Sequence, residues 1–206
     1  MDEELFRFIN GQWTSPFLDF LMPFISSKMT FQIPLLLSGG ALLAFGKYRE
    51  RLLVILAVVV IAVGDGGIVS NLKHAFNRPR PYQRLENVRQ VSLRGIEITS
   101  RPSPYVRGGS MPSGHVANNT AVAWLVFWLY RRWRRLVWAW PALMMYSRVY
   151  TGDHYPSDVV IAFLVASIYT YAIALIARRG WQRWAPSIYP KLYEKHSFLF
   201  PSADSS

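Results

Sequence analysis

Apolar residues in this sequence gather in long runs, and short basic turns separate the runs. Such runs are typical of helices that cross a membrane, which need about 20 mostly apolar residues. The clearest run contains a single acid, Asp65. The predicted membrane-spanning helices are 31–46, 52–72, 115–130, 136–150 and 157–177. The predicted fold class is therefore all-α, an integral membrane helical bundle of about five to six transmembrane helices.

Both ends of the chain differ from these runs. Residues 1–28 are amphipathic and broken by one glycine and two prolines, so we expect short helices at the membrane surface, with room for a sixth crossing. Residues 178–206 are basic and aromatic and are predicted to form an interfacial C-terminal tail that frays at 201–206. We expect a single membrane-embedded domain over 1–206.

The longest polar stretch, 73–115, is rich in arginine and proline and too long for an ordinary connection. Its pattern is compatible with a hairpin or with small helices and does not decide between them. Five of its arginines are predicted to form a lid that binds lipid headgroups: Arg84, Arg89, Arg94, Arg101 and Arg107.

Composition supports a membrane protein, since 51% of the residues are hydrophobic and 17% are charged. The formal net charge of +11 would suggest nucleic acid in a soluble protein. Here the cations lie between apolar runs, which favours the bilayer and a phosphorylated membrane lipid as partners, and no nucleic acid. The absence of cysteine excludes disulfides and thiolate chemistry.

The short basic turns at 47–51 and 131–135 predict the orientation, because such turns tend to stay in the cytoplasm. The segments 73–115 and 148–156 then face the periplasm or the exterior. We therefore expect a multi-pass protein of the cell (inner) membrane.

Three motifs carry the candidate chemistry, and each lies at the end of an apolar run. They read KHAFNRPRP at 73–81, PSGH at 112–115 and SRVYTGDHYPSD at 147–158. Helices that end on the same side of a membrane can bring all three together around one phosphate.

The cations and the PSGH motif are predicted to bind that phosphate. Lys73 supplies a point charge, while Arg80 and Arg148 can each bind two oxygens. Ser113 and Gly114 open a helix, whose first backbone N–H groups attract an anion.

His154 is the candidate nucleophile. Asp158, four residues later, can fix the imidazole tautomer, which leaves the other nitrogen free to attack phosphorus. His115 would protonate the leaving oxygen. This set describes a phosphohistidine mechanism with no metal and no cofactor.

Other polar residues have more ordinary interpretations. Asp65 is expected to orient Lys73 or a neighbouring arginine, although an acid within a span is a functional candidate. Ser147 could bind phosphate or cap its helix, with nothing to choose between them. Arg78 is expected at the solvated surface, as are two further histidines, His74 and His196.

The three motifs resemble the three-part signature of the type 2 phosphatidic acid phosphatase (PAP2) superfamily. The match covers about 85 residues, from Lys73 to Asp158, and holds at every signature position. The resemblance implies a helical bundle with its site at the outer membrane–water boundary. It also implies the roles given above for the catalytic residues His154, His115 and Asp158. The phosphate-binding residues it implies are Lys73, Arg80, Ser113, Gly114 and Arg148.

By this resemblance we expect a membrane lipid phosphatase that removes a terminal phosphate from a prenyl diphosphate, phosphatidylglycerophosphate or phosphatidate. A lipid A 1-phosphatase or a lipid phosphotransferase would use the same site. A phospholipid-binding or transport protein without chemistry is a second alternative. A soluble vanadate haloperoxidase shares the motifs but lacks the apolar runs.

Overall fold

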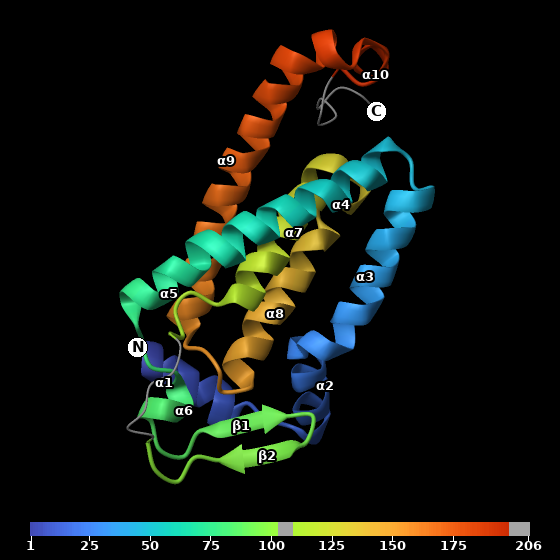
Figure 1. The fold of residues 1–206 in the computed structure, drawn as a ribbon. Coiled ribbons are helices and arrows are strands. Elements are labelled where there is room, and N and C mark those ends of the chain that lie inside the picture. The colour runs from blue at the N-terminus through green and yellow to red at the C-terminus, as the bar shows by residue number, and fades with distance from the viewer. Residues whose placement is uncertain (103–108, 198–206) are drawn as a thin grey trace.

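The computed structural model describes residues 1–102 and 109–197, and only the backbone of residues 28–32. Within these residues nearly all regular structure is helical, and the helices form an elongated bundle with a small hairpin at one end (Figure 1). The predicted all-α class is confirmed.

A helix occupies each predicted crossing. The helix α4 continues through a π-helical turn, η2, into α5 (Figure 1). The elements of the bundle are α3 (Lys28–Phe45), α4 (Tyr48–Ile61), η2 (Ala62–Val69), α5 (Ser70–Phe76), α7 (Gly114–Leu129), α8 (Ala139–Tyr150) and α9 (Pro156–Ile188). Among the described residues, two helical stretches are long and apolar enough to cross a membrane, Tyr48–Arg84 and Pro156–Ile188, with mean hydropathies of 2.7 and 2.5.

Smaller elements close the two ends of the bundle (Figure 1). One end holds α1 (Asp2–Arg7), η1 (Phe8–Gln12), α2 (Pro16–Ser26), α6 (Pro81–Arg84), β1 (Arg89–Ser92) and β2 (Gly95–Ile98). The other holds η3 (Arg131–Trp133), η4 (Leu136–Trp138) and α10 (Pro190–Lys195). The segment 73–115 thus contains both a short helix and a hairpin.

The amphipathic N-terminal segment is folded against the bundle. In α2, Met22 and Ile25 are buried and the helix packs on α8, while Phe17 and Phe20 stay exposed. At the other terminus the predicted tail is helical as far as Lys195. The predicted fraying at 201–206 lies outside the described residues.

Helix α7 forms the centre of the bundle and packs against α4, α8 and α9. Its buried positions include Ala117 and Ala121, and the buried face of α9 includes Ala162 and Ala166. Small residues let membrane helices approach closely and gain van der Waals contact. This packing fixes the start of α7, where the PSGH motif ends, against its neighbours.

Gly64 in η2 sets the spacing between this part of the chain and α9. A Cβ atom on Gly64 would lie 2.4 Å from Cζ of Tyr169, so only glycine fits there. The turn of η2 is wider than an α-helical turn, and such π-helical turns are frequent at functional sites. Here it carries Asp65.

The hairpin β1–β2 is joined to the turn between α8 and α9. The backbone N–H of Val91 donates to the carbonyl of Thr151 at 3.2 Å, and the side chain of Asn10 donates to the carbonyls of Arg89 and Tyr150. Gly152 fits beneath β1 with a φ of 83°, which glycine tolerates. The hairpin thereby braces the turn that precedes His154.

The predicted arginine lid needs one correction. The Arg89 guanidinium lies 2.7 Å from a carboxyl oxygen of Asp19 and is mostly buried. It therefore stabilises the fold and does not belong to a headgroup-binding lid. Three of the other predicted lid arginines are exposed: Arg84, Arg94 and Arg101. The last, Arg107, lies outside the described residues.

Candidate active site

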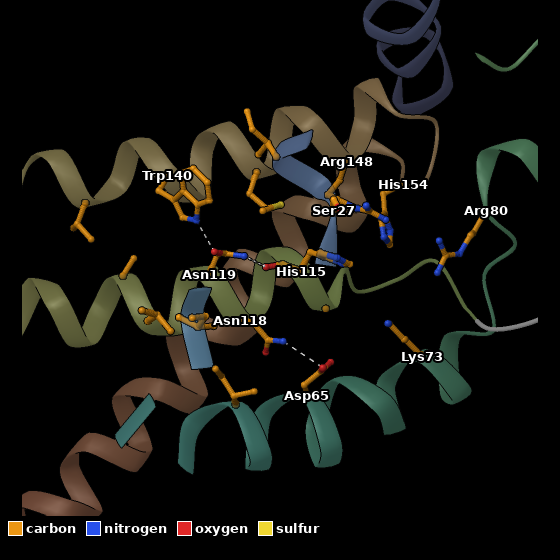
Figure 2. A pocket seen from close by; sticks show the side chains of 18 residues that line it. Ser27, Asp65, Lys73, Arg80, His115, Asn118, Asn119, Trp140, Arg148 and His154 are labelled. Carbon is orange, nitrogen blue, oxygen red and sulfur yellow. Dashed lines mark hydrogen bonds between the residues drawn. The ribbon is translucent and has the colours of Figure 1, made fainter. Parts of the chain in front are cut away.

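The three sequence motifs meet at a cavity of about 870 Å³. In Figure 2 the side chains of Lys73, Arg80, His115 and His154 point toward one another from four separate segments. Six of the eight predicted site residues line this cavity: Lys73, Arg80, Gly114, His115, Arg148 and His154. The other two, Ser113 and Asp158, are fully buried behind it.

The start of α7 presents the PSGH motif to the cavity. Ser113 is the residue before the helix, and its backbone N–H donates to the carbonyl of Asp158 at 3.3 Å. Its buried hydroxyl has no hydrogen-bond partner among the described residues. A Cβ atom on Gly114 would lie 2.8 Å from Oδ1 of Asp65 and 3.5 Å from Nζ of Lys73, so the glycine lets both groups approach the helix start.

His154 lies in the turn between α8 and α9 and is 2% exposed. Its backbone N–H donates to the carbonyl of Arg148 at 3.2 Å, which closes the turn. Burial lowers the pKa of His154 from 6.5 to about 4, against the opposing effect of Asp158. The imidazole is therefore neutral at pH 7, as a nucleophile must be.

Asp158 faces His154 but makes its hydrogen bonds elsewhere. Its Oδ2 lies 3.7 Å from Nδ1 of His154, longer than a hydrogen bond, and accepts from the backbone N–H of Tyr155 at 2.8 Å. Its Oδ1 accepts from Nη1 of Arg78 at 2.7 Å. A small movement of the ring would be enough to form the predicted His–Asp bond.

Arg78 is not the solvated surface residue that the sequence predicted. Besides Asp158, its guanidinium donates to Oγ of Ser157 and to Oδ2 of Asp2, both at 2.6 Å, and it lies 4.1 Å from the ring centroid of Tyr155. Asp2 also accepts from the backbone N–H of Ser157. The sequence held no signal for this arrangement, because its members come from three segments far apart in the chain.

Asp153 was also missed, although it stands directly before His154. Its carboxyl group lies 3.2 Å from Arg80 and 3.0 Å from Arg148 and accepts from the hydroxyl of Thr151. Burial raises the pKa of Asp153, but the positive charge of Arg148, the hydrogen bond from Thr151 and the charge of Arg80 outweigh it, so the pKa is lowered overall and the carboxylate is charged. It holds the two guanidinium groups beside the nucleophile.

Ser147 has neither of the roles considered for it. The side chain is fully buried, its hydroxyl donates to the carbonyl of Met22 at 2.6 Å, and it contacts the hydroxyl of Ser26. It therefore joins α8 to α2 and does not line the cavity.

Asp65 lines the cavity and accepts a hydrogen bond from Nδ2 of Asn118 at 3.2 Å. Its predicted role in orienting Lys73 stays a prediction. His74 is exposed, as expected, with Nδ1 against the carbonyl of Ser70. His196 is half-buried and stacks on Tyr48.

Comparison with known proteins decides the family. The model of the PAP2 superfamily matches residues 52–203, which is more than half of the chain and includes all three motifs. The chain belongs to the PAP2 superfamily. It is a membrane lipid phosphatase of that superfamily. The family and the enzyme class predicted from the sequence are both confirmed.

Two curated relatives cover most of the chain. It is 28% identical over 194 residues to a lipid A 4′-phosphatase of Porphyromonas gingivalis, covering 88% of this chain and 76% of the relative. It is 29% identical over 204 residues to YbjG of Escherichia coli, named as a candidate undecaprenyl-diphosphatase, covering 95% of this chain and 90% of the relative.

Two crystal structures share the fold. Aquifex aeolicus LpxE aligns with a TM-score of 0.60 and 28% identity, over 83% of this chain and 93% of that one. A transmembrane PAP2-type phosphatidylglycerolphosphate phosphatase of Bacillus subtilis aligns with a TM-score of 0.55 and 19% identity, over 84% and 83%. The second similarity concerns the fold alone.

Proposed function

We propose that this PAP2-superfamily protein removes the terminal phosphate of a membrane lipid through a covalent phosphohistidine on His154. The observation that supports this best is the meeting of two histidines and three cations around one cavity. Binding a phosphate would need the cations, but it would not need a pair of imidazoles on the same cavity. The pairing favours a reaction that takes up and returns a proton.

In this proposal the phosphate is held by Lys73, Arg80 and Arg148, and by the first backbone N–H groups of α7. The hydroxyl of Ser113 supplies a further donor, since it has no partner among the described residues. Burial around Arg148, which is 7% exposed, strengthens its attraction to the anion. The same charges stabilise the transition state, where the phosphoryl oxygens carry the charge.

The first step is attack by His154 on phosphorus. Since Nδ1 faces Asp158, Nε2 is the attacking atom. The Nε2–P bond forms as the bond from phosphorus to the leaving oxygen breaks, and protonated His115 gives its proton to that oxygen. The lipid leaves as an alcohol, or as a monophosphate where the substrate is a diphosphate.

The second step returns the enzyme to its starting state. Neutral His115 takes a proton from water, the water oxygen bonds to phosphorus, and the P–N bond breaks. Inorganic phosphate leaves, His154 is again neutral, and His115 is again protonated. Every step uses side chains of this chain and needs no metal or cofactor.

The substrate classes considered are those predicted from the sequence, prenyl diphosphate and phosphatidylglycerophosphate or phosphatidate. Relatives named for lipid A and for undecaprenyl diphosphate favour a phosphorylated lipid of the cell envelope. A phosphotransferase would use the same first step and replace water with a second acceptor.

We also propose that the site faces the periplasm or exterior.

Phosphate release from a panel of these lipids, measured in detergent with EDTA present, tests the proposal. His154→Ala should lower kcat to background, because it removes the proposed nucleophile. Labelling with a ³²P-lipid and quenching in alkaline SDS should trap an acid-labile, base-stable phosphoprotein in the wild type and none in the variant.

His74→Ala is the matched control, because it removes an exposed histidine outside the cavity and should retain wild-type turnover. Undetectable phosphate release by the wild type, with lipid binding unchanged in His154→Ala, would establish the lipid-binding alternative instead. Turnover by His154→Ala equal to that of the wild type would overturn His154 as the nucleophile. Transfer of phosphate to a second lipid in place of release would identify a phosphotransferase.

A further inference from the structure

The cavity does not end at the phosphate-binding residues but continues along α7. His115, then Asn118 and Asn119, and then Val122 line it in that order. One helical turn advances about 5.4 Å along the axis, so the two asparagines lie one turn beyond His115. The cavity therefore changes from cationic to polar and then to apolar along one helix.

The polar zone is built from three elements, and we name Asp65, Asn118, Asn119 and Trp140 the polar band (Figure 2). Asn118 donates to Asp65 at 3.2 Å, and Trp140 donates to Oδ1 of Asn119 at 2.6 Å. Asn119 donates in turn to the carbonyl of His115 at 2.7 Å. These bonds fix the band directly next to the proposed general acid.

The band offers an acceptor to a ligand. Nδ2 of Asn118 is used by Asp65, while its Oδ1 is buried and has no hydrogen-bond partner among the described residues. A buried acceptor without a donor is unfavourable, so such atoms usually meet a ligand or water. The carboxyl oxygens of Asp65 add further acceptors beside it.

We propose that the polar band binds the hydroxyl groups of a sugar or similar polyol that carries the scissile phosphate. This rests on the proposed function, in which His115 protonates the leaving oxygen. The group bonded to that oxygen must then lie next to His115, where Oδ1 of Asn118 has no donor among the described residues and Asp65 can accept a further hydrogen bond. Hydroxyl groups are donors that fit those atoms.

The band disfavours the prenyl phosphates. In a prenyl diphosphate the leaving side begins with a second phosphate, whose oxygens would meet the oxygens of Asp65 and Asn118 and repel them. In a prenyl monophosphate the leaving side is hydrocarbon, which leaves the Asn118 acceptor unpaired. A sugar phosphate avoids both penalties.

The rest of the cavity fits the same class of lipid. Beyond the band its lining is apolar and includes Leu35, Ile61, Val122 and Val137. The order of phosphate, hydroxyl-bearing and hydrocarbon zones is the order of groups in a phosphorylated glycolipid. We therefore assign such glycolipid phosphomonoesters as the preferred substrate class.

The test compares a glycolipid phosphomonoester with a prenyl monophosphate in the same mixed micelles. The wild type should show a kcat/KM at least about 10-fold higher for the glycolipid. Asn118→Leu keeps the side-chain size but removes the acceptor, and should lower kcat/KM for the glycolipid at least about 10-fold. The value for the prenyl phosphate should stay unchanged or rise, because no acceptor is then left unpaired. The prenyl phosphate thus reports whether the variant is folded.

Asn71→Leu is the matched control, because Asn71 is exposed on α5 and outside the cavity, and it should change neither value. Equal losses for both substrates in Asn118→Leu, or a wild type that prefers the prenyl phosphate, would overturn the polar band. Phosphate release from neither substrate, nor from any lipid of the panel described above, would instead overturn the proposed function, and the band's role with it. Release from another lipid of that panel but not from the glycolipid would overturn the band alone.

A measurement on the wild type alone guards against an unstable variant. The dephosphorylated glycolipid should inhibit with a Ki at least about 10-fold lower than that of the matching prenol, because only the glycolipid can donate to the band. Equal inhibition by the two alcohols would contradict the proposal.

Discussion

At the scale of single residues, the support of the nucleophile reaches the first residues of the chain. Asp158 faces His154, Arg78 binds Asp158 at 2.7 Å, and Asp2 binds Arg78 at 2.6 Å. Burial opposes the charge on Asp2, yet the bonds from Ser157 and Arg78 lower its pKa overall. Since Arg78 does not line the cavity, we expect it to position Asp158 without touching the lipid.

Replacing Arg78 tests this residue-scale inference. Arg78→Ala leaves the buried Asp158 carboxyl without its cation and should lower kcat about 10- to 100-fold, with KM within about twofold. Arg78→Lys should recover part of the rate. Steady-state kinetics of phosphate release measures both.

Arg183→Ala is the control, because that arginine is exposed near the end of α9 and does not line the cavity. A rise in KM with unchanged kcat for Arg78→Ala would mean that Arg78 binds substrate instead. Unchanged kinetics would remove it from the support of the nucleophile.

At the scale of elements, the π-helical turn η2 lets one continuous helix serve two purposes. The α4 portion provides an apolar crossing, while the wider turn brings Asp65 to the cavity beside α7. The turn is held at Gly64, where the ring of Tyr169 from α9 leaves no room for a side chain. The site therefore depends on helix spacing as much as on its own residues.

Gly64→Ala should disturb that spacing, since its Cβ would lie 2.4 Å from Tyr169. Overpacking of this kind costs about 1–3 kcal/mol, so we expect a lower midpoint in thermal or SDS-induced unfolding. Activity should fall as well, because η2 carries Asp65.

Gly66→Ala is the matched control two residues away, since a Cβ there meets nothing within 4 Å. It should leave the midpoint unchanged or slightly raised, because alanine favours helix over glycine. Equal midpoints for both variants would show that α9 shifts to accommodate the methyl group.

At the scale of the whole molecule, the site and the basic turns occupy opposite ends of the bundle. The hairpin β1–β2 and α1 lie at the end that carries the three motifs, while the α3–α4 turn and α10 lie at the other (Figure 1). The positive-inside tendency then predicts that the hairpin end faces outward. A lipid phosphatase so placed would act on the outer leaflet.

Cysteine labelling tests this orientation, and the absence of native cysteine makes the signal specific. Leu93→Cys, at an exposed position in the hairpin turn, should react with a membrane-impermeant maleimide in intact cells. Ser187→Cys, exposed near the end of α9, should react only after permeabilisation. The reverse pattern would place the site in the cytoplasm.

The sequence alone determined the fold class and the approximate crossings, and it predicted eight candidate residues for the site. Long apolar runs and fixed motif spacing are local properties, so they can be read without coordinates. Six of those eight residues do line one cavity, and the other two lie directly behind it.

Only the tertiary structure decided which groups support that site. Arg78, Asp153 and Asn118 read as ordinary polar residues, and their importance comes from partners distant in sequence or from burial. For Ser147 and Arg89 the sequence predicted too much, since it suggested a role toward the lipid for each. In the structure both side chains bind residues of neighbouring elements instead. Such pairings depend on how helices pack, and the packing of α7 against its neighbours is a property of the whole chain.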